Sequence, residues 1–247
     1  MKTKSSSDAK ELGGIDKVTT ASDEKGVART AGILFIIATL ASILSLPFLG
    51  SISASNYLVS VSSNGNQITT GGFIALIGAF ASASIAISLY PVLRRHNEGL
   101  ALGAVGFRLI EGVMYIVGVV FLALLLSLSQ ESVKGGALGS SYFQTEGVVL
   151  LAGYHWAEYV GGPLAFCLGA LIYYFIFYQS RLIPRWLSGW GLIGIVLLLA
   201  TTILVIFGEI AAFSTFQVLL ALPIGVQEMA LAVWLIVKGF RNTGDLT

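Results

Sequence analysis

The chain has 247 residues, of which 55% are hydrophobic and 11% are charged, with a formal net charge of +1 and one cysteine. Soluble domains usually carry about 25% charged residues, so these charges are too few to cover a water-facing surface. The composition excludes a soluble enzyme, a disulfide-stapled secreted domain and a nucleic-acid-binding protein, and it predicts a polytopic membrane protein.

The N-terminal segment differs from the rest of the chain. Residues 1–29 hold six basic and five acidic side chains. No apolar run follows the first lysines, so we expect no secretory signal peptide. The polar composition predicts a disordered cytoplasmic tail over residues 1–28, followed by a membrane domain over residues 29–241. A short cytoplasmic tail is expected over residues 242–247.

Six apolar stretches are long enough to cross a bilayer, which takes about 20 residues in a helix. Their apolar runs are continuous and lack the alternation of barrel strands, so helices are predicted. The predicted spans are residues 31–49, 71–93, 100–128, 148–178, 187–208 and 216–237. We therefore predict an all-α fold, in which one domain forms a bundle of six transmembrane helices.

The connection between the first two spans carries a hairpin signal. Alternating residues over 57–70 flank Asn64-Gly65, a dipeptide that favours a tight turn between two strands. An isolated hairpin is marginally stable in water, so an ordered one would have to rest on the helix ends. The pattern leaves an ordered hairpin open at this connection.

Lysine and arginine are distributed unequally between the two sides of the predicted bundle. Twelve fall on the side that holds both chain ends, one (Lys134) falls on the other side, and Arg108 lies within a span. Because basic residues accumulate in cytoplasmic connections, we expect a multi-pass plasma-membrane protein with both termini in the cytoplasm. Aromatic residues favour the membrane interface, and Tyr173, Tyr174 and Trp186 are predicted to lie there.

Several ionisable side chains fall within the predicted spans, where such groups usually face a bundle interior or a cavity. They are Arg108, Glu111, His155, Glu158 and Glu228. Residues three apart share a helical face, so Arg108 is predicted to pair with Glu111, and His155 with Glu158. Tyr115 extends the face of Glu111, and Glu228 is expected to be a second partner of Arg108.

Two prolines are predicted to bend the spans that carry these groups. Pro163 follows Glu158 by five residues, and Pro223 precedes Glu228 by five. Each proline removes a helix hydrogen bond. A bend near Pro163 would bring Glu158 toward Glu111, so the acidic residues could meet in one cluster.

Three interpretations of this cluster stay open. The charged pairs could be structural ion pairs, or the cluster could bind a ligand, an ion or a proton. The excess of glutamates over basic groups predicts that one of them, Glu228, carries a proton at neutral pH. A metal site is the third reading, because His155, Glu158, Glu111 and Glu228 could supply ligands. Against a metal, the spans hold one histidine, no HExxH motif and no cysteine pair, and Cys167 is expected to be a buried, inert thiol.

Three blocks of sequence resemble a known family. They are residues 28–34 (Ala-Arg-Thr-Ala-Gly-Ile-Leu), residues 91–95 with 106–111 (Pro-Val-Leu-Arg-Arg and Gly-Phe-Arg-Leu-Ile-Glu) and residues 181–191 (Arg-Leu-Ile-Pro-Arg-Trp-Leu-Ser-Gly-Trp-Gly). The chain resembles, over roughly residues 28–241, the bacterial six-helix membrane family of domain of unknown function 4386. The resemblance implies a six-span bundle in a prokaryotic plasma membrane, with no established activity, and it supplies no known catalytic residues to carry over.

The sequence is compatible with three classes of function. The first is binding or transport of a small solute or lipid, with the acidic cluster linking binding to protonation. The second is an intramembrane hydrolase, metal-assisted or not, with His155 or Glu158 as general base. The third is a structural or accessory membrane protein. The expected partners are the lipid bilayer and a small-molecule or lipid ligand, without nucleic acid, and no pattern identifies a cofactor.

Overall fold

The computed structural model describes residues 6–135, 140–212 and 214–241, and the regular structure in these ranges is helical. The described residues contain six helical segments that are long and apolar enough to cross a membrane. These segments are Asp23–Ser53, Gly65–Leu93, Glu98–Gly135, Ser141–Ser180, Arg185–Ile206 and Thr215–Val237. The predicted all-α fold with six transmembrane helices is confirmed.

The spans are built from the following elements. The first is formed by the later part of the helix α1 (Ser6–Ser45) and by the 3₁₀-helix η1 (Leu46–Ser53), and the second and third are α3 (Gly65–Leu93) and α4 (Glu98–Gly135). The fourth consists of α5 (Ser140–His155), the π-helix η3 (Trp156–Gly161) and α6 (Gly162–Ser180). The last two are α7 (Arg185–Ile206) and α8 (Thr215–Val237), and the short helix α2 (Tyr57–Ser63) joins η1 to α3.

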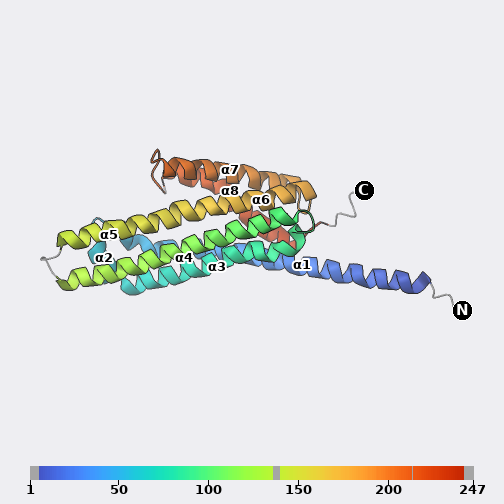
Figure 1. The fold of residues 1–247 in the computed structure, drawn as a ribbon, viewed down its shortest axis with the longest axis horizontal. Helices are drawn as coiled ribbons and strands as arrows, with labels where there is room; N and C mark the ends of the chain where they lie inside the picture. Colours follow the sequence, from blue (N-terminus) through green and yellow to red (C-terminus); the bar gives the residue numbers. More distant parts are fainter. Residues whose placement is uncertain (1–5, 136–139, 213, 242–247) are drawn as a thin grey trace.

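The helix α1 differs from the disordered tail that the sequence predicts over residues 1–28. It begins at Ser6 and continues without a break into the membrane domain. Figure 1 shows its N-terminal part, in blue, projecting beyond the other helices. No proline occurs before Pro47, so nothing in this stretch removes a backbone donor and interrupts the helix. Residues 1–5 and the predicted tail over 242–247 lie outside the described residues.

The hairpin that the sequence left open over residues 57–70 does not form. Helix α2 and the first residues of α3 occupy this connection. Tyr57 and Val61, four apart, are both buried, which is the spacing of one helical face rather than of one strand face. Asn64 ends α2 by donating from its backbone N–H and its Nδ2 to the carbonyl of Ser60. The Asn-Gly dipeptide therefore joins two helices.

The six spans form a ring in chain order. Helix α3 packs between α1 and α4, α4 packs on α5 and α6, and α6 packs on α7, which packs on α8. Helix α8 returns to α1 and closes the ring. At this contact a Cβ added to Gly32 would lie 2.7 Å from the carbonyl oxygen of Ala232. The closure therefore needs a residue without a side chain on α1, as is common where membrane helices approach closely.

The two ends of the ring differ in charge. The end that holds residues 94–97, residues 181–184 and the last turn of α8 is called here the basic end, because most lysines and arginines gather there. Tyr173 and Tyr174, predicted at the interface near this end, are instead fully buried in the bundle, so that prediction was wrong. Trp186 is 61% exposed, as a residue at an interface would be. At the opposite end, α7 and α8 stop short of α4 and α5 (Figure 1).

Candidate functional site

Two adjoining cavities lie inside the ring. The first, called the Arg108 chamber, has a volume of about 330 Å³ and is lined by Arg108, Glu111 and Glu228 among others. The second, called the Glu158 chamber, has a volume of about 290 Å³ and contains Glu158. Each chamber is lined by residues from all six spans. The side chains that line both are Ser42, Ile43, Tyr115, Pro163, Leu198 and Ala221. The chambers are therefore neighbouring parts of one interior space.

One face of α4 runs along this interior space. Arg108, Glu111, Tyr115 and Gly118 follow one another at intervals of three or four residues, so they lie along one side of the helix. Arg108 and Glu111 line the Arg108 chamber, Tyr115 lines both chambers, and Gly118 lies beside Glu158. Tyr115 therefore lies on the same face of α4 as Glu111, as predicted, and it lines both chambers.

Arg108 and Glu111 form a fully buried ion pair. Arg108 is 1% exposed and Glu111 is 2% exposed, and Nη1 of the arginine lies 2.9 Å from Oε2 of the glutamate. The guanidinium also lies over the ring of Phe166, at 4.9 Å from its centroid. The predicted pairing of Arg108 with Glu111 is confirmed.

Ser82 of α3 completes this pair, although little in the sequence singles it out. Its Oγ donates to Oε1 of Glu111 at 2.7 Å and accepts from Nη2 of Arg108 at 2.8 Å. Its carbonyl oxygen also accepts from Nε and Nη2 of Arg108, at 3.3 and 3.2 Å. In the sequence Ser82 is one of several small residues in its span, a pattern typical of close helix packing. The triad of Ser82, Arg108 and Glu111 is held by these hydrogen bonds and the ion pair, and it joins α3 to α4.

Gly169 of α6 makes room for the stem of Arg108. A Cβ added at this position would lie 3.0 Å from Cγ and 3.2 Å from Cδ of the arginine. Gly106, on the same helix as Arg108, has nothing within 4 Å of the corresponding position. The position of Arg108 therefore depends on a glycine in the neighbouring helix.

Glu228 of α8 lines the Arg108 chamber but does not join the triad. Its Oε1 is buried and makes no hydrogen bond, and no ion pair links it to Arg108, within the described parts of the chain. The adjacent Gln227 behaves differently, because it accepts from the hydroxyl of Tyr174 at 2.5 Å and donates to the carbonyl of Leu187 at 3.0 Å. Helix α8 thus places a bonded amide next to a carboxyl group without an ion partner.

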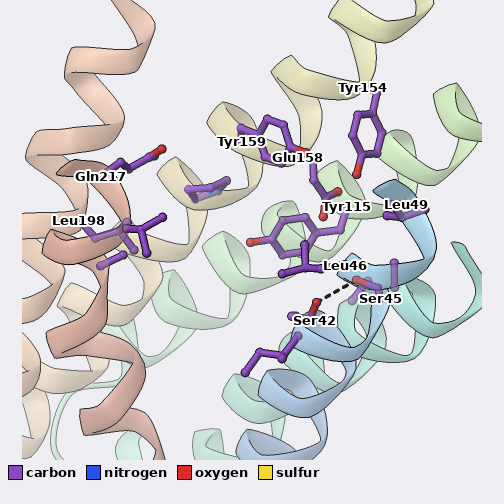
Figure 2. A pocket seen from close by; sticks show the side chains of 16 residues that line it. Ser42, Ser45, Leu46, Leu49, Tyr115, Tyr154, Glu158, Tyr159, Leu198 and Gln217 are labelled. Atoms are coloured by element: carbon purple, nitrogen blue, oxygen red, sulfur yellow. Dashed lines mark hydrogen bonds between the residues drawn. The ribbon is translucent and has the colours of Figure 1, made fainter. Parts of the chain in front are cut away.

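His155 and Glu158 do not form the predicted pair. The π-helix η3 begins one residue after His155, and its wider turn changes which residues share a face. His155 is exposed and stacks on the ring of Tyr159, with centroids 5.2 Å apart. Glu158 points into its chamber, near Tyr115 and Tyr154, as Figure 2 shows. The prediction assumed a regular α-helix, in which His155 and Glu158 would share one face, and it was therefore wrong for His155.

Glu158 is held close to the backbone of α4. A Cβ added to Gly118 would lie 2.8 Å from Oε2 of Glu158, so the carboxylate occupies the space that a side chain would need. The regular α-helix is interrupted here, because the π-helix η3 ends at Gly161, two residues before Pro163, which has no N–H to donate. Tyr154, Tyr159 and Gln217, which sequence reasoning did not select, also line the Glu158 chamber.

The residues considered as metal ligands do not come together. In residues 6–135, 140–212 and 214–241, no group of three or more His, Cys, Asp or Glu side chains is placed to hold a metal ion. His155 faces outward, Glu158 lies in one chamber, and Glu111 and Glu228 lie in the other. Cys167 is a buried free thiol, as expected.

One comparison with known proteins covers nearly the whole ring. The model of a family described as "Domain of unknown function (DUF4386)" matches residues 30–239, which include most of the first span and all of the other five. This match agrees with the resemblance found in the sequence blocks. No curated protein and no solved structure matches the chain.

Proposed function

The chain belongs to the DUF4386 family, a domain of unknown function, and we propose that this member binds or carries a small amphiphilic solute or lipid inside the bilayer. We also propose that binding is linked to protonation of a buried carboxyl group. The observation that carries the proposal is an interior space lined by all six spans, which holds carboxyl groups without ion partners among the described residues. Ionisable residues in such places mark pathways and binding sites.

The arrangement of the charges supports binding more than a purely structural role. The triad of Ser82, Arg108 and Glu111 accounts for one carboxylate, and it needs no ligand. Glu158 and Glu228 have no ion pair in the described residues, yet both line the cavities. The hydrolase alternative has less support, because the imidazole of His155 stacks on Tyr159, is exposed and does not line the Glu158 chamber.

Glu228 is the group to which we assign the proton. It lies in the Arg108 chamber, near the positive charge of Arg108 but outside its ion pair. A ligand that enters the interior changes the surroundings of this carboxyl group, so binding and proton uptake or release are coupled. Calorimetry in two buffers with different heats of ionisation measures the protons exchanged, and Glu228→Gln is expected to lower that number.

The test of binding uses three small single-ring probes that differ in charge: benzyltrimethylammonium, benzyl alcohol and phenylmethanesulfonate. The purified protein is titrated with each in one detergent. We expect at least one probe to bind the parent and to lose its affinity in Ala221→Trp, because Ala221 lines both chambers. Leu222→Trp is the matched control, since Leu222 is an exposed neighbour on the same helix. Failure of all three probes to bind the parent would overturn the proposed function.

We propose that the basic end faces the cytoplasm, in the plasma membrane. Single cysteines at Ser63 and Asn97 lie on opposite ends of the ring, and both positions are exposed. In intact cells a membrane-impermeant thiol reagent is expected to label the cysteine at Ser63 and to spare the one at Asn97. Cys167 is buried and supplies little background. The reverse labelling pattern would invert the proposed orientation.

A further inference from the structure

The charge balance of the Glu158 chamber indicates what kind of ligand it accepts. In the described residues, the ion pairs are Arg95 with Glu24, Arg108 with Glu111 and Lys134 with Glu131, so none involves Glu158. Arg108 is already bonded to the other two residues of the triad, and it lines the other chamber. The Glu158 chamber therefore contains a carboxyl group and no lysine, arginine or histidine in its wall.

Aromatic side chains surround this carboxyl group. Tyr115, Tyr154 and Tyr159 all line the chamber, and Figure 2 shows them around Glu158. The rings of Tyr154 and Tyr159 lie edge to face, with centroids 5.8 Å apart. Tyrosine rings attract cations through their negative faces, and the attraction grows when water is excluded. An aromatic wall beside a carboxylate is thus suited to a positively charged group.

The rest of the chamber limits the size and polarity of that ligand. Much of its wall is apolar, with Leu46 and Leu49 on one side and Leu198 on another. Its volume of about 290 Å³ lies at the lower end for small-molecule pockets, which hold about 300–1,000 Å³. Such a space suits a molecule with one ring and a compact head group, and it is too small for a whole phospholipid.

We propose that the Glu158 chamber binds a lipophilic organic monocation with a single ring, a protonated amine or a quaternary ammonium ion. The cationic group lies against the Glu158 carboxylate and the tyrosine rings, and the apolar part lies against the leucines. This inference rests on the proposed function and narrows its ligand to one chemical class. It also gives η3 a role, since this π-helix turns Glu158 toward the chamber and His155 away from it.

The test compares the three probes on variants of Glu158. The parent is expected to bind benzyltrimethylammonium about tenfold or more tightly than phenylmethanesulfonate, which has a similar ring and the opposite charge. Glu158→Gln is expected to weaken binding of the cation about tenfold and to leave benzyl alcohol unchanged. Glu146→Gln is the matched control, because Glu146 is an exposed glutamate on the same span, and it is expected to bind like the parent.

A second pair of variants keeps the charge and moves it. Gly118→Ala is expected to displace the Glu158 carboxylate and to weaken cation binding several-fold, because the new Cβ would lie 2.8 Å from Oε2. Gly106→Ala, on the same helix and in open space, is expected to leave binding unchanged. This pair decides the question if Glu158→Gln fails to fold.

The outcomes separate this inference from the proposed function. Binding of the alcohol or the sulfonate without preferred binding of the cation would overturn the cation site and keep a small-molecule site. Equal cation affinity in the parent, Glu158→Gln and Gly118→Ala would overturn the inference as well. If none of the probes binds the parent, the proposed function itself is wrong.

Discussion

In the Arg108 chamber, the arginine and one glutamate are bonded to each other and to Ser82, whereas in the Glu158 chamber the carboxyl group faces tyrosines and leucines. Both chambers are lined by the same six spans, and Tyr115 lines both. We propose that this difference reflects two roles of charge inside one membrane bundle. The Arg108–Glu111 pair lies within α4 and is joined to α3 through Ser82, whereas we propose that Glu158, which has no ion partner in the described residues, serves a ligand.

The largest expected effect comes from breaking the triad. Arg108→Leu leaves Glu111 buried without its counter-charge, and such a change costs about 3–5 kcal/mol of unfolding free energy. Arg108→Leu with Glu111→Leu is expected to recover most of the loss, because both charges are gone. Denaturation in one detergent measures both. Equal losses in the single and the double variant would show that the loss does not come from an unpaired Glu111.

The same measurement on Glu158→Gln sharpens the contrast. We expect this variant to unfold at the parent's temperature or above it, because it removes a charged group without an ion partner in the described residues. A loss as large as that of Arg108→Leu would show that Glu158 is structural, and the two chambers would then not differ in role.

A smaller effect is expected from crowding the arginine. Gly169→Ala places a Cβ within 3.0 Å of the Arg108 stem, and overpacking of this kind costs about 1–3 kcal/mol. Gly106→Ala is the control, since nothing lies within 4 Å of its Cβ. Thermal unfolding of both variants is the measurement. Unchanged stability in Gly169→Ala would mean that Arg108 can move without cost.

Glu228→Gln tests the carboxyl group that lies in the Arg108 chamber outside the triad. The substitution keeps the shape of the side chain and breaks no ion pair in the described residues, so we expect a change below about 1 kcal/mol. Chemical denaturation is compared with that of Arg108→Leu. If the free energy of unfolding fell by several kcal/mol, Glu228 would contribute to stability in the same way as Glu111.

The smallest expected effect lies outside both chambers, at the basic end. Partial burial lowers the pKa of His96 from its usual value of 6.5, and Arg95 lowers it further while Glu24 opposes this. The unfolded chain therefore binds the proton more readily, so His96 makes stability fall as pH drops below about 6.5. His96→Gln is expected to reduce the loss of melting temperature between about pH 7.5 and about pH 5.5. An identical loss in parent and variant would exclude His96 as a source of pH dependence.

The six spans could be predicted from the sequence, because a long apolar run in a membrane has few alternatives to a helix. The pairing of Arg108 with Glu111 could also be predicted, because both lie on a regular α-helix, where residues three apart are neighbours. The same rule failed for His155 and Glu158, since it does not hold in a π-helix. Pro163 signals an irregularity in the helix there, but not the π-helix that is found.

Other features depend on packing between helices, which a single sequence does not display. In the sequence, Ser82 is a small residue typical of a helix contact. Only the packing of α4 against α3 shows that its hydroxyl forms hydrogen bonds with both Arg108 and Glu111. Tyr173 and Tyr174 are residue types that favour the interface, yet Tyr173 packs on Phe35 of α1 and Tyr174 bonds to Gln227 of α8. The Asn64-Gly65 signal is local, and the burial of Tyr57 against neighbouring helices outweighs it.

The unequal lengths of the spans have a consequence for the surrounding lipid. Helix α4 has 38 residues and α7 has 22, which correspond to about 57 Å and about 33 Å. Exposed apolar side chains extend along α4 from Leu102 to Val133, whereas α7 just matches a hydrocarbon layer of about 30 Å. Lipid on the α4 flank must stretch or the bundle must tilt, while lipid on the α7 flank is unstrained. The protein therefore either tilts in the bilayer or meets hydrocarbon of different thickness on its two flanks.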